Sequence, residues 1–329
     1  KARVKDGNAI RVGNGTLYDD NFIQKLNNSH NGVQQFEGQG IKVAINNADL
    51  AVSDESEGSL ILVEPLQYQT ELTFTGDKTT LQAAKKGWLL EVKEHSNVHY
   101  ALTDGKMNGL VHKVESADSY LTLDNATWTL EKKGEGTTAT FTELKLNEGS
   151  TLNAATKEGN TPFTLKGDVY ATNSVIDLTH EKGENPYSDR LIVEGNYTGD
   201  NAIIKMNTLW NAPGGEDGED SESDVFEVKN GVAKGKTTVV PVSKEGKENV
   251  IDGSVQQIAK TLNTVDVVVT EGRESDKTFV GTAKTTGATE VQLTPNGNNF
   301  RGTMIAREEP KPEEPEVPTE PEKPTEPEV

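Results

Sequence analysis

The chain has 329 residues, of which 33% are hydrophobic and 5% aromatic, and its formal net charge is −20 at pH 7. This acidic balance disfavours DNA, RNA and anionic lipid as partners, because like charges repel. The absence of cysteine excludes disulfide bonds and thiolate zinc sites. The composition is too polar for a compact α/β enzyme of this length. It fits an elongated all-β protein, whose narrow core needs few apolar residues.

The N-terminal part of the chain alternates turn signals with short strand patterns. Strands are predicted at Ile10–Val12 and Ile41–Ile45. Apolar residues at helical spacing predict a short helix within Asp20–Phe36, with Asn-rich turns as the alternative. Further strands are expected at Leu60–Val63, Leu72–Phe74 and Gly87–Val92. The start, Lys1–Val4, has neither an initiator Met nor an apolar signal core, so we expect a piece of a longer precursor.

Recurring pairs of apolar-x-apolar couplets dominate residues 120 to 206. Each couplet places two side chains on one face of a strand. The second couplets begin at Trp128, Leu152, Ile176 and Ile204, which are 24, 24 and 28 residues apart. Such a repeat is typical of a solenoid whose coils stack to bury an inner face. We therefore predict a right-handed parallel β-helix of on the order of 12 coils. The first couplets are Leu121/Leu123, Leu144/Leu146, Phe163/Leu165 and Leu191/Val193.

The C-terminal third of the chain has a different pattern. The acidic, Gly-rich segment Ala212–Asp224 is predicted to be a polar loop outside the coil, and apolar residues at helical spacing predict a short helix over Val255–Leu262. The tail from Glu308 contains seven of the 13 prolines and is expected to be a polyproline II spacer. The remaining segments are predicted strands, the last four forming antiparallel hairpins: Val225–Val228, Thr237–Val242, Val265–Thr270, Phe279–Ala283, Glu290–Leu293 and Phe300–Ile305.

Three segments resemble a known family. Ser188–Asn207 and Asp224–Val242 are similar to recurring coils of autotransporter passenger domains of the pertactin and AIDA-type group, and Val265–Met304 is similar to their C-terminal autochaperone region. The resemblance implies a β-helix shaft over residues 1–264, an autochaperone-like hairpin cap over 265–307 and a Pro/Glu-rich linker over 308–329. It also implies secretion through a Gram-negative outer membrane, with the protein's own outer-membrane β-barrel translocator as a partner.

Carboxylates and histidines are the first candidates for chemistry. His95 and His99 have the i, i+4 spacing of helical metal ligands, but the local sequence predicts strand and turn, where these positions lie about 13 Å apart. Asp124 and Asp177 could lie on stacked coils as the carboxylate pair of a carbohydrate-active enzyme. Solvated side chains at turn edges are the alternative that we favour.

Three other segments have both a functional and a structural interpretation. Asp252–Ser254 contains Asp-Gly-Ser, but the Gly-Asp-Ser-Gly context of serine-protease autotransporters is absent. Glu216–Asp224 is rich in carboxylates and could hold Ca²⁺, although a hydrated loop is the preferred interpretation because no known calcium-loop spacing is present. Lys166–Asp168 resembles a minimal integrin-binding tripeptide, and a turn at a strand end is the alternative.

The three tryptophans are candidates for a sugar-stacking platform. Trp128 alternates with Leu130 and is predicted to lie in the core. Trp210 leads into the acidic loop and is the better surface candidate, and Trp88 begins a predicted strand.

From these observations we assign no catalytic, metal-binding or cofactor-binding residue. We expect a non-catalytic passenger, displayed on the bacterial surface or secreted, that binds a host-cell or matrix protein or glycan, or itself, and no nucleic acid. One alternative is a structural stalk that presents an N-terminal functional domain, and another is a carbohydrate-active enzyme on a β-helix. Gram-positive wall proteins also carry Pro/Glu tails, which leaves a rival location open.

Overall fold

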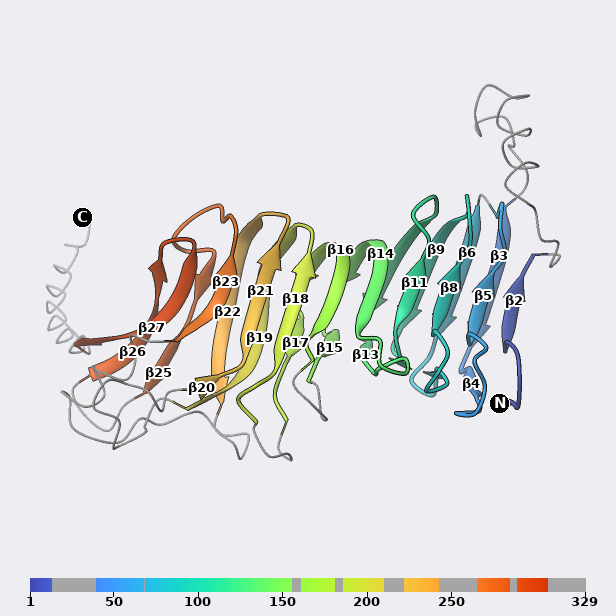
Figure 1. Cartoon of the computed structure of the whole chain (residues 1–329), viewed down its shortest axis with the longest axis horizontal. Coiled ribbons are helices and arrows are strands. Elements are labelled where there is room, and N and C mark those ends of the chain that lie inside the picture. The colour runs from blue at the N-terminus through green and yellow to red at the C-terminus, as the bar shows by residue number, and fades with distance from the viewer. Residues whose placement is uncertain are drawn as a thin grey trace, which may run out of the picture.

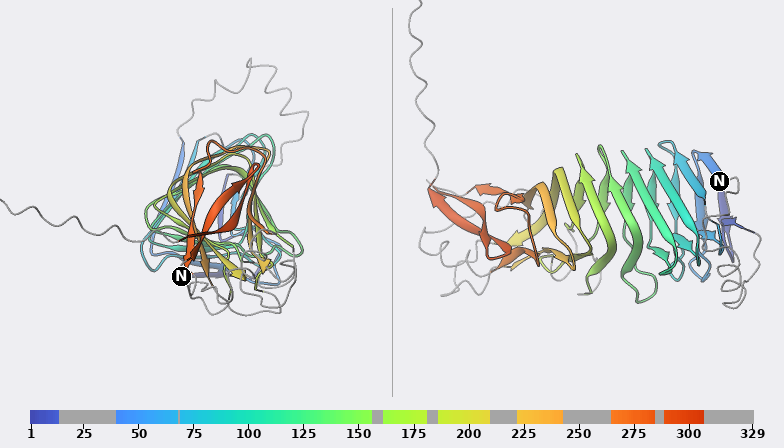
Figure 2. Two further views of the ribbon diagram at one scale, coloured as in Figure 1. Left: turned by 90° about the vertical axis from the view of Figure 1, so that its left-hand side faces the viewer. Right: turned by 90° about the horizontal axis from the view of Figure 1, so that it is seen from above.

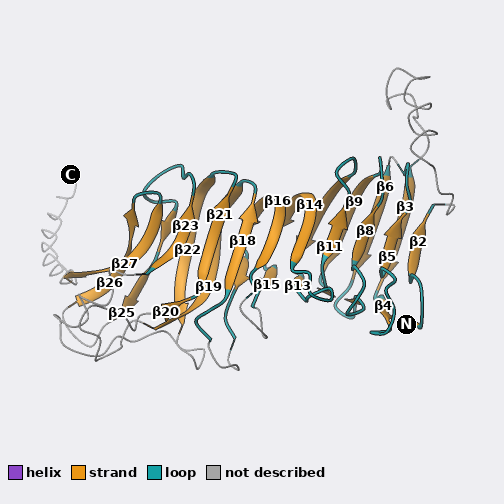
Figure 3. Ribbon diagram, in the orientation of Figure 1, coloured by secondary structure: helices purple, strands orange, loops and turns teal. Residues whose placement is uncertain are grey.

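The computed structural model describes residues 1–13, 40–67, 69–155, 161–180, 186–209, 222–242, 265–284 and 289–306. These residues form strands, turns and loops, and they include no helix (Figure 3). The strands follow one another along an elongated rod, with β2 at one end and β26–β27 at the other (Figure 1). The predicted helices within 20–36 and 255–262, and the linker from residue 308, lie outside the described residues.

Each turn of the chain contributes strands to three parallel ladders, which we call faces A, B and C and which surround a common interior (Figure 2). Face A contains β3 (Ile41–Asn46), β6 (Thr70–Thr75), β9 (Asn97–Thr103), β12 (Asp118–Asp124), the second halves of β14 (Thr138–Leu146) and β16 (Phe163–Thr172), and the first halves of β19 (Tyr197–Leu209) and β22 (Ala233–Val242).

Faces B and C complete the coil. Face B contains β1 (Ala2–Val4), β4 (Asp49–Val52), β7 (Thr80–Gln82), β10 (Lys106–Asn108), β13 (Thr127–Thr129), β15 (Thr151–Asn153), β17 (Val175–Asp177), the second halves of β19 and β22, and β24 (Phe279–Val280). Face C contains β2 (Ile10–Val12), β5 (Ile61–Val63), β8 (Leu90–Val92), β11 (Val111–Lys113), the first halves of β14 and β16, β18 (Arg190–Glu194), β21 (Val225–Lys229) and β23 (Asp266–Thr270).

The predicted stacking of the second couplets is confirmed residue by residue. Trp128 pairs with Leu152, Leu152 with Ile176, and Ile176 with Ile204, all on face B. The all-β, largely parallel solenoid arrangement follows from these pairings. Face B has ten stacked strands among the described residues, close to the about 12 coils expected from repeat length.

The first couplets, whose spacing along the chain is not constant, belong to two different faces. Leu121 and Leu123 pair with Leu144 and Leu146 on face A. Phe163/Leu165, by contrast, pair with Leu191/Val193 on face C. Alternation with a period of two residues is the same on every face, so the couplet pattern alone does not distinguish them.

The core is a continuous apolar column inside the three faces. Trp128 is fully buried, as predicted, and its indole Nε1 donates to the carbonyl oxygen of Gly109 at 2.8 Å. Tyr197 is also fully buried, and its hydroxyl shares a 2.8 Å hydrogen bond with Thr237. Each large side chain with a polar atom therefore meets a partner inside the coil, which removes the cost of burying that atom.

At the corner between faces A and B, successive coils turn through a residue with left-handed backbone conformation. Asn47, Asp104, Asn125, Asn173 and Asn201 have φ values between 46° and 62°. Asn and Asp tolerate this conformation better than other non-glycine residues. The Asn125 amide donates to Asp104 at 2.8 Å, and the Asn201 amide donates to Asn173 at 2.6 Å. The corner is therefore a polar ladder that links adjacent coils.

The C-terminal end is closed by antiparallel strands. β25 (Thr282–Lys284) pairs with β26 (Thr289–Asn296), which pairs with β27 (Asn299–Ala306), and β27 runs antiparallel to β23 of face C. A second antiparallel element, β20 (Glu222–Ser223), pairs with the end of β19. The predicted hairpins are thus confirmed for β25–β27. The prediction was wrong for β23 and β24, which extend the parallel ladders of faces C and B by pairing with β21 and β22. We call β25–β27 the cap.

An aromatic column connects the last coils to the cap. Tyr197 contacts Phe226 at a ring-centroid distance of 5.0 Å, and Phe226 contacts Phe279 at 6.0 Å. Phe279 in turn contacts Phe300 of β27 at 5.3 Å. Because these rings are fully buried, the apolar core of the shaft continues into the cap without interruption.

Candidate functional site

A buried polar cluster lies where faces B and C meet in the later coils. His180 follows β17, Asp189 precedes β18, Asn207 lies in β19, and Asp224 precedes β21. The Asp224 carboxylate accepts hydrogen bonds from the backbone amides of Asp189 at 3.0 Å and Asn207 at 2.6 Å. The Asn207 side-chain oxygen accepts from the His180 backbone amide at 2.9 Å. We call these four residues the buried acidic cluster.

Burial decides the electrostatics of this cluster. Asp224 has no solvent-exposed surface, and this burial, reinforced by the nearby charges of Asp189 and Asp177, raises its pKa to about 8. The backbone hydrogen bonds from Asn207 and Asp189 oppose the shift without cancelling it. His180 Nδ1 lies in contact with the Asp189 carboxylate, which is also buried. Both carboxylates are therefore shielded from solvent, and that of Asp224 fixes the backbone at the start of β18 through the Asp189 amide.

The sequence contained a signal for this cluster that was missed. Ser188–Asp189 and Ser223–Asp224 are the same dipeptide, each directly before the apolar alternation of a face C strand. Since Arg190 pairs with Val225, the two Ser-Asp dipeptides occupy equivalent positions in adjacent coils. The repeat of Ser-Asp at this position would have predicted two stacked aspartates.

The predicted carboxylate pair is not brought together. Asp124 lies in β12 on face A and pairs with Thr103, whereas Asp177 lies in β17 on face B between Asn153 and Lys205. Asp177 instead accepts hydrogen bonds from the backbone amide and hydroxyl of Thr179, and its charge acts on Asp224 of the buried acidic cluster. The stacking assumption failed because the two residues belong to different ladders.

A second polar cluster lies on the outside of face C. The Trp88 ring stacks on the imidazole of His112, with ring centroids 4.7 Å apart and planes inclined by 17°. The ammonium of Lys133, from the turn between β13 and β14, lies 4.8 Å from the centre of the Trp88 ring. All three side chains are partly exposed. We call Trp88, His112 and Lys133 the lysine–aromatic cluster.

Charges around His112 are predominantly positive. Partial burial lowers the pKa of His112, and the charges of Lys93, Lys113 and Lys133 lower it further, while Glu91 opposes them. Glu91 lies directly opposite His112 in the ladder and pairs with Lys93, which follows the end of β8. The hydrogen bonds that Glu91 accepts from Lys93 and Ser59 outweigh its own burial and lower its pKa. Trp88 was a candidate from the sequence, whereas its contacts with His112 and Lys133 had no signal there.

The histidine pair His95 and His99 does not form a chelating arrangement. His95 has a φ of 56° in the turn before β9, and His99 lies in β9 and stacks on Tyr120 of the next coil at 4.8 Å. Among the described residues, no group of three or more His, Asp or Glu side chains is placed to hold a metal ion. The strand and turn predicted for this segment are confirmed by β9 and by the turn that contains His95.

The tripeptide Lys166–Asp168 lies in β16 at the corner between faces C and A. The Lys166 ammonium lies 3.6 Å from the Glu194 carboxylate, and Asp168 accepts a 2.9 Å hydrogen bond from the backbone amide of Asn196. Gly167 has a φ of 145°, and a Cβ at this position would come within 2.3 Å of the Phe141 carbonyl oxygen. Both charged residues therefore make contacts between coils. Trp210, Asp252–Ser254 and residues 216–221 lie outside the described residues.

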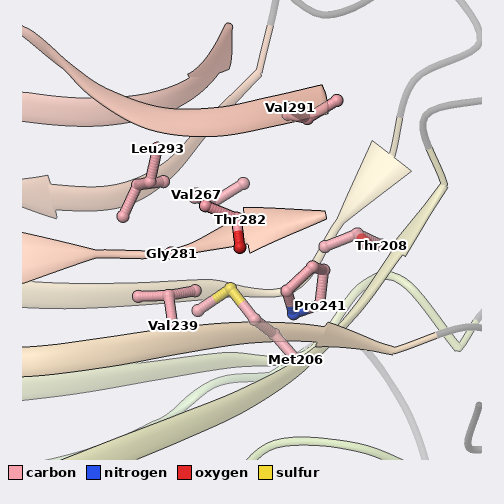
Figure 4. Close-up of a pocket in the computed structure, with 9 residues that line it drawn as sticks. All are labelled: Met206, Thr208, Val239, Pro241, Val267, Gly281, Thr282, Val291 and Leu293. Atoms are coloured by element: carbon pink, nitrogen blue, oxygen red, sulfur yellow. The ribbon is translucent and has the colours of Figure 1, made fainter. Parts of the chain in front are cut away.

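A small crevice separates the last coil from the cap (Figure 4). Its empty space is about 250 Å³, part of which is open to solvent. Coil and cap contribute mainly apolar side chains, among them Met206, Val239, Pro241, Val267, Val291 and Leu293. We interpret this crevice as the joint between the shaft and the cap.

Comparison with known proteins gives no family for this chain. No family model and no curated protein matches its sequence. In the described part of the chain there is no helix with the length and apolar character needed to cross a membrane.

Proposed function

We propose that this chain is a non-catalytic, surface-displayed passenger of a bacterial autotransporter that contacts host cells or matrix. In this proposal the three ladders form a right-handed β-helix, and the cap is its autochaperone-like end. The observation that supports it is the order of elements: stacked parallel coils, then an antiparallel cap, then a Pro/Glu-rich segment. The passenger's own outer-membrane β-barrel would be its partner in export.

The cap has the features required of a folding nucleus in such a protein. It emerges first if export proceeds from the C-terminus, and its Phe300 ring continues the aromatic column of the shaft through Phe279. A coil that lacks a neighbour cannot bury its inner face, so each folded coil provides the template for the next one. Folding from the cap would therefore proceed along the rod, one coil at a time.

The outside of the rod provides the adhesive surface in this proposal. Extended solenoids present long surfaces on which side chains repeat with the spacing between strands. The lysine–aromatic cluster is one place on this surface where aromatic and cationic groups are combined. Aromatic residues and cations are common in the energetic centres of recognition surfaces.

A carbohydrate-active enzyme is the second candidate. Asp189 and Asp224 are the neighbouring carboxylates that come nearest to its catalytic pair, but both are buried away from solvent. The two candidates are separated by measuring binding of the labelled full chain to host cells and matrix, beside reducing-sugar release from a polysaccharide panel. Saturable cell binding without sugar release supports adhesion. Sugar release that is lost in Asp224→Asn would establish the enzyme, and the absence of both signals would favour a stalk.

A further inference from the structure

The proposed adhesive function leaves the chemistry of the bound partner open, and the following inference rests on that function. We propose that the lysine–aromatic cluster of Trp88, His112 and Lys133 binds a glycan through a single acidic sugar, whose carboxylate lies among the lysine ammonium groups around His112. The partner is thus a glycan with an isolated acidic residue, and not a protein or a polyanion.

The geometry of the cluster holds its cationic groups in place. Lys133 lies over the Trp88 ring at 4.8 Å, and His112 stacks on the same ring at 4.7 Å. The backbone of Lys133 is fixed by a bridge to Gly136, and the neighbouring Gly134 amide donates to the Lys85 carbonyl at 2.7 Å. These contacts reduce the rotamer entropy that a free lysine would lose on binding.

The local charge is opposite to that of the whole protein. Among the described residues, Lys93, Lys113 and Lys133 act on His112 as positive charges, and Glu91 acts on it as a negative charge. Glu91 is already paired with Lys93 and accepts a hydrogen bond from Ser59. An added carboxylate therefore meets more positive than negative charge around His112. Complementary charge of this kind gives specificity for an anionic ligand.

The net charge of the chain favours a ligand with a single negative charge over a polyanion. With 53 Asp and Glu against 33 Lys and Arg, the chain repels polyanions at distances beyond the cluster. A single carboxylate on an otherwise neutral glycan avoids this long-range repulsion, because only the residues within about one Debye length act on it strongly. A sulfated polymer would be attracted to the cluster but repelled by the acidic remainder of the rod.

His112 provides a reporter for the bound anion. The charges that act on it come from Glu91 in β8, Lys93 just after β8, Lys113 in its own strand and Lys133 in the turn between β13 and β14. A carboxylate that binds beside these lysines reduces the positive potential at the imidazole, so the pKa of His112 rises on binding. This shift distinguishes binding at the cluster from binding elsewhere on the rod.

The test uses the full chain with sialyllactose, lactose and heparin as probes, with affinity measured by calorimetry and the His112 ring followed by NMR. We expect sialyllactose to bind and to raise the pKa of His112, and lactose not to bind. In Lys133→Met the affinity falls by about tenfold or more. Lys106→Met is the matched control, because Lys106 is an exposed lysine on face B, and it keeps wild-type affinity.

Three results would overturn the inference. The first is equal binding of lactose and sialyllactose, and the second is an equal loss in Lys106→Met. The third is tighter binding of heparin than of sialyllactose, which would indicate a polyanion site. Failure of glycan binding with intact cell binding refutes this inference alone, whereas loss of both refutes the adhesive function as well. Thermal unfolding of Lys133→Met, expected to match wild type, separates lost binding from lost folding.

Discussion

The backbone amide of Asp189 donates a hydrogen bond to the carboxylate of Asp224 at 3.0 Å, although the two residues are 35 positions apart in the chain. Each of them opens a face C strand, and the two strands are neighbours in the ladder. Stacking of coils has therefore placed two equivalent acidic residues in contact inside the protein. The energetic consequence is the raised pKa of Asp224, which makes the shaft sensitive to pH at this point.

The first prediction concerns that sensitivity. The pKa of Asp224 rises from an ordinary 3.8 to about 8 in the folded chain. The folded state therefore binds this proton more tightly than the unfolded state, and its stabilising effect is complete below about pH 4 and is lost as the pH rises towards 8. The loss has a limit of about 1.4 kcal/mol per pH unit. Asp224→Asn should remove this part of the pH dependence.

Urea unfolding between pH 4 and 9 tests this prediction. The free energy of unfolding of wild type and of Asp224→Asn is compared at each pH. His180, Asp189 and Asp177 are the other titratable groups of the described residues at this site and are retained in both proteins. The unfolding free energy of wild type minus that of Asp224→Asn should fall continuously up to about pH 8. A constant difference across the range would show that Asp224 has an ordinary pKa.

The second prediction concerns the corner between faces A and B. Asn173 has a φ of 46°, which strains a β-branched residue. Asn173→Val should cost about 1–2 kcal/mol in unfolding free energy, and Asn173→Gly should cost less because glycine adopts this conformation freely. Thr172→Val, at the adjacent strand position, is the control and should remain close to wild type. If Asn173→Val is as stable as Asn173→Gly, the corner does not require a left-handed residue.

The third prediction compares two tryptophans. Trp128 is fully buried and hydrogen-bonded to Gly109, so Trp128→Ala should reduce the unfolding free energy by about 3–5 kcal/mol. Trp88 is partly exposed, and Trp88→Ala should cost about 1 kcal/mol. Chemical denaturation followed by circular dichroism measures both. Equal losses in the two variants would contradict the assignment of Trp128 to the interior and Trp88 to the surface.

The fourth prediction tests attachment of the cap. The Asp266 carboxylate accepts hydrogen bonds from Arg301 and Asn299 at 2.9 Å and from Asn296 at 3.1 Å. Asp266→Ala removes all three and should increase the rate of proteolytic cleavage within residues 289–306 by about tenfold, because local opening becomes easier.

The matched control for the cap is Asp276→Ala. Asp276 pairs with Arg273, but its side chain is 76% exposed, and exposed ion pairs contribute little. Its cleavage rate should equal that of wild type, as followed by mass spectrometry of the fragments. Equal acceleration in both variants would mean that loss of any surface carboxylate, and not release of β27, loosens the cap.

Particular residues show how much of the fold could be predicted from sequence. The interval between Trp128, Leu152 and Ile176 stays at 24 residues, so their stacking could be counted along the chain. Elsewhere the step between face B partners varies from 21 residues, between Met107 and Trp128, to 48, between Ala2 and Leu50. The variation comes from loops of different length, so the register of the strands cannot be found by counting residues along the sequence.

The couplet pattern could not predict the lysine–aromatic cluster either, because it does not show which residues of different coils lie side by side. Trp88 and Lys133 lie on different coils, and their contact depends on the conformation of the turn before β14. His112 is opposite Glu91 only because Leu90 and Val111 are in register. The two stacked aspartates, by contrast, were within reach, since the repeated Ser-Asp dipeptide marks equivalent positions. Inward-facing residues carry a periodic signal, and outward-facing residues do not.

Surface display is the central claim, and accessibility on living cells tests it most directly. Intact cells of the organism that makes this protein are labelled with an antibody against the described coils and are treated in parallel with an external protease. The account predicts strong labelling of intact cells and loss of the label after protease treatment, without lysis. Labelling that appears only after the cells are broken open would contradict it.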